Sequence, residues 1–391
     1  MAEKRAFDSE GAQPASKSKA ARFNAHILKK LQAAVMKDPE INLAEQFPPE
    51  YPQRLMEMRK PIESSPKKTK YNPPGFVKAD EDIRRSLCPS DPVEIVFPLS
   101  DAVAKLIEPV SQTAGGLPVG LSQRLFEVLK SSEILWKAPF ARQKGVFKCS
   151  AEIVVKAVRN MEHYTEYTAL QYLDRHMPNI PVPKPLGLVR MSGISLIFMS
   201  HMGSAPLGEV WHTLDSCQKT SLSNQLNTIL ADLRTLPFTE GTPLGGVAGE
   251  GCRDLRRHVR LSETPITSLE DFETFLFSSS HPGGNVFVEF LRRLSPSFTS
   301  HSDPRIVFTH GDIRPDNIMV ELADNNKYMV SGILDWEYSG FYPDYYESVR
   351  CTNCLSPYEE DDWFLYLPEC VSPKIYAQWW LLDRVRETRV V

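Results

Sequence analysis

The stretch 308-FTHGDIRPDNIMV-320 constrains the fold of this chain more than any other part of its sequence. It places charged and polar residues, among them Asp312, Arg314, Asp316 and Asn317, between two short apolar runs. Such runs are typical of buried strands, and a polar insert with Gly and Pro between them is typical of a loop. The pattern therefore predicts a polar loop held at both ends by buried strands, which is a suitable place for chemistry.

A β-hairpin is predicted directly after this loop. The runs 318-IMVEL-322 and 328-YMVSGILD-335 are separated by Asp- and Asn-rich turn residues. The returning strand brings Asp335 near Asp312 and Asn317, so three oxygen-bearing side chains meet at one end of a small sheet. Mg²⁺ bound to a triphosphate requires hard oxygen ligands of this kind.

Length and composition limit the classes of protein to consider. The 391 residues suffice for two domains or one two-lobed enzyme, and 42% apolar with 24% charged residues is ordinary globular composition. A net charge of −4 gives no support for nucleic acid or an anionic membrane as the main partner. A small molecule or another protein is the more natural partner.

The cysteines and the N-terminus indicate a cytoplasmic protein. Seven cysteines are too few for a disulfide framework in a chain of this length, and an odd number leaves a thiol free. The start MAEKRAFDSE is polar and lacks the apolar core of a signal peptide. No stretch approaches the roughly 20 apolar residues of a membrane span. We therefore expect no secretion and no membrane-spanning segment.

Residues 1–90 differ in composition from the rest and predict an extension that is largely disordered or loosely packed. They are rich in Pro, Ser and Lys and poor in apolar periodicity. The exception is 25-AHILKKLQAAVMK-37, whose apolar residues share one helical face. A helix packing on the main domain is the simpler interpretation, and a helix docking on a partner or a membrane surface is the alternative. The clusters KSK and PKKTK are either nuclear targeting signals or solvated basic runs.

A small antiparallel sheet is predicted after residue 91. The segments 134-ILWKAPF-140 and 146-VFKCSAEIVVKAV-158 are rich in β-forming residues, and 194-ISLIFM-199 is a further strand. Between them, 161-MEHYTEYTALQYLDRH-176 has apolar residues at near-helical spacing. Lys156 stands alone in the apolar run IVVKAV, and its burial is costly unless an anion pairs with it.

Beyond the glycine-containing linker HMGSAPLG the pattern becomes helical. The segment 222-LSNQLNTILADLRTL-236 carries a stripe of leucines, and further helices are predicted at 268-SLEDFETFLF-277 and 285-NVFVEFLRRL-294. The chain therefore runs through strands, a helix, a strand, a linker, and then helices that carry the polar loop and its hairpin. This order predicts the α+β class.

Together these residues resemble a known family. The spacing of His310, Gly311, Asp312, Asn317 and the hairpin residue Asp335 is similar to the catalytic loop H-R-D-x-x-x-x-N and the metal aspartate of the kinase fold. Glycine in place of the loop arginine, followed by ILDWEYSGFYPDYYE, resembles the aminoglycoside phosphotransferase and choline kinase-like family, and within it the fungal type. The resemblance covers about residues 135–380.

The resemblance implies a two-lobed protein kinase-like fold. Residues 91–200 would form an N-terminal lobe with a small antiparallel nucleotide-binding sheet. Residues 201–391 would form a mainly helical C-terminal lobe with the catalytic loop and the acceptor site. The expected function is transfer of the γ-phosphate of ATP, with Mg²⁺, to a hydroxyl of a small molecule.

The resemblance also assigns residue roles. Asp312 would be the catalytic base and His310 would brace its loop, while Asn317 and Asp335 would hold Mg²⁺. The remaining expected contacts are with the nucleotide: Lys156 with the phosphates, Glu166 as the ion-pair partner of Lys156, Gly145 in the phosphate loop, and Met199, His201 and Met202 at an adenine-binding hinge.

Two positions depart from the family pattern. Arg314 stands where many members, reading HGDLHPxN, have a second histidine, and a guanidinium beside the γ-phosphate or the substrate is chemically sensible. The phosphate-loop segment 140-FARQKGVFK-148 contains one glycine, Gly145, where protein kinases have three. Backbone contacts at Gly145, helped by Lys144, would have to replace the missing glycines.

Several alternatives remain open at this point. The acidic run 359-EEDD-362 either lines a pocket for a cationic acceptor or is a solvated face. The tryptophans Trp363, Trp379 and Trp380 are either a wall of the acceptor site or core residues. In 351-CTNC-354 the spacing allows zinc, but no second cysteine pair follows, which favours ordinary thiols. For the whole chain, the alternatives are an inactive nucleotide-binding scaffold and a kinase that acts on proteins.

Overall fold

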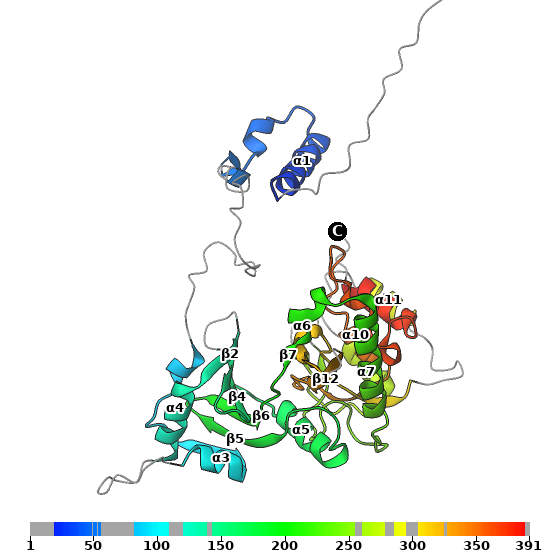
Figure 1. Cartoon of the computed structure of the whole chain (residues 1–391). Coiled ribbons are helices and arrows are strands. Elements are labelled where there is room, and N and C mark those ends of the chain that lie inside the picture. The colour runs from blue at the N-terminus through cyan, green and yellow to red at the C-terminus, as the bar shows by residue number, and fades with distance from the viewer. Residues whose placement is uncertain are drawn as a thin grey trace, which may run out of the picture. The chain divides into compact units, whose positions relative to one another are not determined.

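The computed structural model describes residues 19–48, 50–52, 54–55, 82–108, 120–138, 143–254, 260–277, 285–294, 304–323 and 327–387. The chain divides into two compact units, Met1–Val77 and Lys78–Val391 (Figure 1). The first unit contains helix α1 (Lys19–Lys37) and the 3-10 helix η1 (Leu43–Gln46).

Helix α1 contains the helix expected at residues 25–37, but its apolar face is only partly buried. Ile27 is buried, whereas Leu28 is 56% exposed. The ring of Tyr51 stacks on Phe23 with centroids 5.6 Å apart, which fixes the segment after η1 against the helix.

The second unit begins with a six-stranded antiparallel sheet in the order β1-β5-β6-β4-β3-β2. Strands β2, β3, β4 and β6 lie where strands were predicted, whereas β1 and β5 were not predicted. The bounds are β1 (Val93–Phe97), β2 (Glu133–Lys137), β3 (Lys144–Lys148), β4 (Ile153–Arg159), β5 (Pro185–Met191) and β6 (Ile194–Ser200).

The two faces of this sheet have different roles, and β4 shows the division. Ile153, Val155 and Ala157 point to one face, where they pack in a core with α3 (Asp101–Leu106) and α4 (Leu121–Ser131). Val154 points to the other face, where it packs with Tyr167 of α5 (Thr165–His176). Because side chains alternate along a strand, Lys156 lies on the α5 face. Lys156 therefore lies between the sheet and α5.

The core of the first face begins before residue 90. Ile83, in the 3-10 helix η2 (Ile83–Ser86), and Leu87 are buried within it. The lobe in the structure thus includes residues that the sequence assigned to the extension. The domain limits 1–90, 91–200 and 201–391 stay a prediction.

A short connection after β6 leads to the helical lobe, where a three-stranded sheet has the order β12-β11-β7. Strands β11 (Ile318–Leu322) and β12 (Tyr328–Ile333) form the predicted hairpin, and β7 (Ala205–Pro206) pairs with β11. Strands β10 (Ile306–Thr309) and β13 (Gly340–Pro343) pair separately. The loop of residues 310–317 therefore runs from one small sheet to the other.

The helices of this lobe gather around those sheets (Figure 1). Helix α7 (Ser216–Leu233) begins at a capping box formed by Asp215 and Gln218, and its leucine stripe is buried in the core. The other elements are α6 (Leu207–Val210), η3 (Trp211–Thr213), β8 (Arg253–Asp254), β9 (Arg260–Leu261), α8 (Leu269–Phe277), α9 (Asn285–Arg293), η4 (Pro315–Asn317), α10 (Tyr346–Arg350), η5 (Asp362–Leu365), η6 (Glu369–Val371) and α11 (Ala377–Glu387).

Two further observations concern the described residues. None of the described helices combines the length and the apolar character that a membrane crossing requires. All seven cysteines are free thiols, with Cys351 buried and Cys354 exposed, so the CxxC spacing forms no disulfide.

The approach of Gly340 to Gly245 yields a prediction on stability. The two strand segments exchange backbone hydrogen bonds between Gly245 and Phe341. A Cβ on Gly340, whose φ is +154°, would lie 2.1 Å from the carbonyl oxygen of Gly245. We expect Gly340→Ala to lower the free energy of unfolding by about 3 kcal/mol. Thermal unfolding measures this, with Gly203→Ala as control because a Cβ there meets nothing within 4 Å. Equal melting temperatures for the two variants would contradict the analysis.

Candidate functional site

The loop between β10 and β11 holds Asp312 through Asn317. The side-chain amide of Asn317, at the end of η4, donates to the carbonyl oxygen and to Oδ2 of Asp312, both at 2.9 Å. Asn317 is buried, whereas the side chain of Asp312 is 22% exposed. Burial raises the pKa of Asp312, and the nearby Arg314 partly opposes this. The loop therefore presents an oriented carboxylate that is more basic than a free aspartate.

His310 braces the loop as a neutral ring. Its Nδ1 accepts from the backbone N–H of Asp312 at 3.1 Å, so its Nε2 carries the proton and donates to the carbonyl of Leu334 at 2.9 Å. The ring packs edge-on against Trp336 at 4.5 Å. Burial lowers the pKa of His310, against the opposite influence of Glu347. His310 thereby links the catalytic loop to the chain just before Asp335.

Glu347 of α10 is a site residue to which the sequence analysis assigned no role. Its carboxylate is 2% exposed and accepts from the backbone N–H groups of His310 at 2.7 Å and Gly311 at 3.1 Å. Arg350, one turn later, donates from Nε to the carbonyl of Gly311 at 3.1 Å. The available signal was an acidic residue at the end of the aromatic segment GFYPDYYE, which follows the hairpin. Both charged side chains hold the loop through hydrogen bonds to its backbone, because the loop has no regular backbone partner there.

Gly311 is required by its conformation. Its φ is +83°, and a Cβ would lie 2.6 Å from the carbonyl oxygen of Tyr338. The close approach brings the segment after Asp335 against the catalytic loop. A steric requirement thus explains why position 311 of this chain is a glycine.

Lys156 joins the two lobes through carboxylates. Its Nζ lies 2.7 Å from Glu166 of α5, 2.7 Å from Asp335 and 3.8 Å from Glu337. Lys144 of β3 pairs with Glu337 at 2.6 Å. The predicted partnership of Lys156 with Glu166 is therefore present in the structure, and Glu337 is an addition that the sequence analysis did not assign.

The protonation of this cluster follows from burial and charge. Burial acts against the ionisation of Lys156, but Asp335, Glu166 and Glu337 outweigh it and raise its pKa well above the usual range. Burial raises the pKa of Glu166 to about 7, with Lys156 opposing and the neighbouring carboxylates adding to the effect. For Asp335, Lys156 outweighs burial and lowers the pKa. Lys156 and Asp335 are thus firmly ionised.

The oxygen ligands of this site fit Mg²⁺. Ligand atoms of Glu166, Asp335 and Glu337 all lie within 4.8 Å of one another. Two lysines face these three carboxylates, and Glu166, with a pKa of about 7, is only partly ionised near neutral pH. The backbone carbonyl of Asn317 accepts from the N–H of Leu334 at 2.8 Å, which places the Asn317 backbone beside the segment that leads to Asp335. Hard oxygen donors of this kind suit a divalent cation.

Asp335 has a strained backbone. Its φ of +67° lies in the left-handed region, which residues with a Cβ seldom adopt. Such strain costs of order 1–3 kcal/mol and concentrates at functional positions. Here it turns the carboxylate toward Lys156.

Gly145 lies inside β3, paired with Ala157 of β4, and a Cβ on it would lie 2.7 Å from the ring of Phe147. Packing therefore explains this glycine. The turn of the predicted phosphate loop, residues 139–142, lies outside the described residues. A role of Gly145 in phosphate binding stays a prediction.

The predicted hinge residues lie where the chain passes between the lobes. Met199 is buried near the end of β6, and the backbone N–H of His201 donates to the carbonyl of Glu152 at 2.8 Å. Met202 lies against Gly332 of β12. Their contact with a nucleotide stays a prediction.

The acidic run 359–362 has structural partners. Lys219 donates to both carboxylate oxygens of Asp362 at 2.7 and 2.8 Å. Asp361 caps η5 by accepting from the N–H of Trp363 at 3.0 Å. Glu359 accepts from the N–H groups of Glu360 and Asp361. These contacts favour the structural interpretation of the run over a pocket for a cation.

The three tryptophans also have packing roles. Trp363 is 2% exposed and packs edge-on against Trp211. Trp379 stacks on Tyr345 at 3.9 Å, and Trp380 donates to Thr352 at 2.9 Å. Core packing is therefore the better interpretation.

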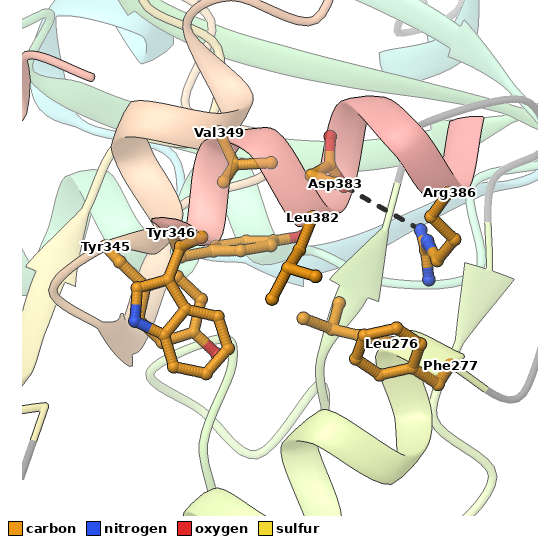
Figure 2. A pocket seen from close by; sticks show the side chains of 9 residues that line it. Leu276, Phe277, Tyr345, Tyr346, Val349, Leu382, Asp383 and Arg386 are labelled. Carbon is orange, nitrogen blue, oxygen red and sulfur yellow. Dashed lines mark ion pairs between the residues drawn. The ribbon is translucent and has the colours of Figure 1, made fainter. Parts of the chain in front are cut away.

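A small cavity lies between α8, α10 and α11. Its volume of about 20 Å³ holds roughly one water molecule, which is too little for a substrate. Figure 2 shows Asp383 and Arg386 of α11 facing each other at its rim, with an ion pair of 3.8 Å. The lining is mainly apolar and aromatic: Leu276, Phe277, Tyr345, Tyr346, Val349, Trp379, Leu382, Asp383 and Arg386.

The hydrogen bonds of Glu347 predict a loss of stability on a conservative change. Glu347→Gln replaces one carboxylate oxygen by an NH₂ group, which cannot accept from the loop amides. We expect the free energy of unfolding to fall by about 2 kcal/mol. Chemical denaturation measures this, and Glu321→Gln on the exposed part of β11 is the matched control. A variant as stable as the control would show that the loop does not depend on Glu347.

The lowered pKa of His310 predicts a dependence of stability on pH. The unfolded chain binds a proton at His310 near pH 6.5, whereas the folded protein does so only at lower pH. His310 contributes its full stabilisation above about pH 6.5. As the pH falls below that value, the free energy of unfolding decreases by up to about 1.4 kcal/mol per pH unit. Denaturation between pH 5 and 7 should therefore give a flatter slope for His310→Gln. His212→Gln, at an exposed position, should retain the wild-type slope. Parallel slopes for all three proteins would refute this assignment.

Comparison with known proteins identifies the family. The sequence model of the phosphotransferase enzyme family (APH) matches residues 157–365, which is more than half of the chain. No curated protein matches the sequence significantly.

Among solved structures, the gentamicin complex of APH(2″)-IIa is 14% identical, with 70% of this chain and 85% of that chain covered and a TM-score of 0.43. APH(3″)-Id from Streptomyces rimosus is 13% identical, with 74% and 99% covered and a TM-score of 0.41. ADP-bound APH(2″)-Ib is also 13% identical, with 69% and 90% covered and a TM-score of 0.41.

The expected fold class is confirmed: an antiparallel-sheet lobe is followed by a mainly helical lobe. With the family match covering the loop, the hairpin and Glu166, the chain belongs to the phosphotransferase enzyme family and has its two-lobed, protein kinase-like α+β fold.

Proposed function

We propose that this protein transfers the γ-phosphate of ATP, with Mg²⁺, to a hydroxyl group of a small molecule. The observation that carries the proposal is the position of Lys156, within 2.7 Å of both Glu166 and Asp335. This arrangement connects the sheet, its covering helix and the segment beside the catalytic loop. It supports a nucleotide site between the lobes.

Each site residue has a role in this proposal. Lys156 binds the phosphates, and Glu166 orients it. Asn317 and Asp335, with Glu337 as an added carboxylate, hold Mg²⁺, which neutralises charge on the phosphates when it is bound. Met199, His201 and Met202 contact the adenine. Transfer itself then depends mainly on positioning and on charge neutralisation.

Asp312 acts on the acceptor. Its raised pKa makes it a better proton acceptor than an exposed aspartate. The acceptor oxygen attacks the γ-phosphorus, the bond to the β–γ bridging oxygen breaks, and ADP leaves with that electron pair. The hydroxyl proton passes to Asp312, while Asn317 keeps the carboxylate oriented through Oδ2.

The alternatives differ in observable ways. A non-catalytic scaffold would bind nucleotide without turnover. A protein kinase needs a segment after Asp335 that holds a peptide, and here β13 follows within five residues and returns directly to the sheet. The seven free thiols support a reducing compartment, and we propose the cytoplasm.

The testing experiment combines binding and turnover. A ligand at 100 times its Kd stabilises the folded state by about 2.7 kcal/mol. We expect Mg²⁺ with ATP to raise the melting temperature of the wild type, and Lys156→Met to remove that rise. Lys130→Met, at an exposed position of α4, is the matched control and should retain it.

Two further variants separate the roles of the acids in the same experiment. Asp312→Asn should bind Mg²⁺ with ATP nearly as the wild type does, but form no ADP with any acceptor. Asp335→Asn should lose the Mg²⁺-dependent part of the rise. Equal loss of binding in both variants would contradict this division. No rise in the wild type would sink the proposal as a whole.

A further inference from the structure

Arg314 is a weakly engaged cation beside the catalytic carboxylate. Its Nε lies 3.4 Å from Oδ2 of Asp312, well beyond the 2.7–2.9 Å of a good charged hydrogen bond. Its side chain is 45% exposed. Within the described part of the chain, Asp312 is the one carboxylate within 4 Å of this guanidinium. Arg314 therefore has donors left for a bound molecule.

A second guanidinium reaches the same segment from β8. Arg253 donates from Nη1 to the carbonyl of Glu337 at 3.2 Å, a neutral acceptor. The backbone of Arg253 is fixed by the hydroxyls of Tyr342 at 3.1 Å and Tyr346 at 2.9 Å. No carboxylate among the described residues pairs with Arg253. Tyr338, the next residue after Glu337, lies against Gly311, so the segment that Arg253 contacts borders the catalytic loop.

The carboxylates nearby are already in use. Glu166, Asp335 and Glu337 face Lys156, and Glu337 also pairs with Lys144. Glu347 binds the loop amides, with both its oxygens engaged. Within the loop itself, the remaining carboxylates are Asp312, which pairs with Arg314 at 3.4 Å, and the exposed Asp316. Arg314 therefore has hydrogen-bond donors beside the loop that an anionic group of the acceptor could use.

We propose that the acceptor is a small hydroxyl compound bearing a carboxylate or phosphate group, which Arg314 binds and Arg253 assists. The proposal rests on the phosphotransferase function argued above. A planar guanidinium binds either anion through two parallel N–H groups, which fixes orientation as well as distance.

The position of Arg314 beside Asp312 also serves the transfer. An acceptor whose anionic group is bound by Arg314 would have its hydroxyl held next to the Asp312 carboxylate. Arg314 is thus a specificity-determining residue whose effect depends on the charge of the acceptor.

The test uses pairs of acceptors that share a carbon skeleton, with and without an anionic group, together with cationic acceptors. ADP formation with Mg²⁺ and ATP is measured for glycerate against glycerol, for glucose 6-phosphate against glucose, and for choline and an aminoglycoside. We expect kcat/KM to favour at least one anionic member over its neutral partner by roughly 10- to 100-fold. The two pairs separate carboxylate from phosphate recognition.

Variants show whether the guanidinium groups cause the preference. Arg314→Gln should reduce it to within about threefold, mainly through KM, and Arg253→Gln should reduce it less. Arg190→Gln, on β5 and paired with Glu94, is the control that removes the same charge elsewhere and should retain the preference. Thermal unfolding in the presence of a non-hydrolysable ATP analogue and each acceptor compares acceptor binding in the wild type and the variants without turnover.

Three results would overturn the proposal. Neutral or cationic acceptors could react as well as anionic ones, or no anionic member could act although nucleotide binds. Arg314→Gln could also slow every acceptor equally, which would assign Arg314 to the γ-phosphate instead. Failure of the phosphotransferase function itself is distinguishable, because it would abolish ADP formation with every acceptor and the melting-temperature rise with nucleotide.

Discussion

The ion pairs of Lys156 are the interaction on which the rest of the site depends. A lysine buried at 8% exposure is unfavourable unless carboxylates compensate it, and removing one partner of such a buried pair costs about 3–5 kcal/mol. The partners come from α5 in the first lobe and from the segment after β12 in the second. The arrangement of the two lobes and the protonation of the site therefore depend on the same ion pairs.

The catalytic loop depends on a different set of charges. Glu347 and Arg350 project from one helix, α10, and bind the backbone of His310 and Gly311. Helices tolerate such buried charges when each is hydrogen-bonded, and here the backbone amides and carbonyl of the loop are the partners. The position of Asp312 is thus set by a helix more than thirty residues later in the chain. The packing of α10 in the helical lobe and the conformation of the loop are coupled for this reason.

The sequence predicted the elements with strong local signals. The hairpin around residues 323–327, the strand containing Lys156 and the leucine-rich helix α7 follow from periodicity and turn residues. Strand β5 was missed because its start, at Pro185, follows a proline-rich segment that reads as a breaker. Glu337 and Glu347 were not assigned because their partners, Lys144 and the loop amides, are remote in sequence and carry no local pattern.

The charges of the site are separated by function. Around Lys156 three carboxylates and two lysines meet, and these hard oxygen donors would suit a divalent cation and, through it, a polyphosphate. Arg314 has Asp312 as its ion-pair partner at 3.4 Å and Arg253 contacts the neutral carbonyl of Glu337, and the proposal of an anionic acceptor rests on these two contacts.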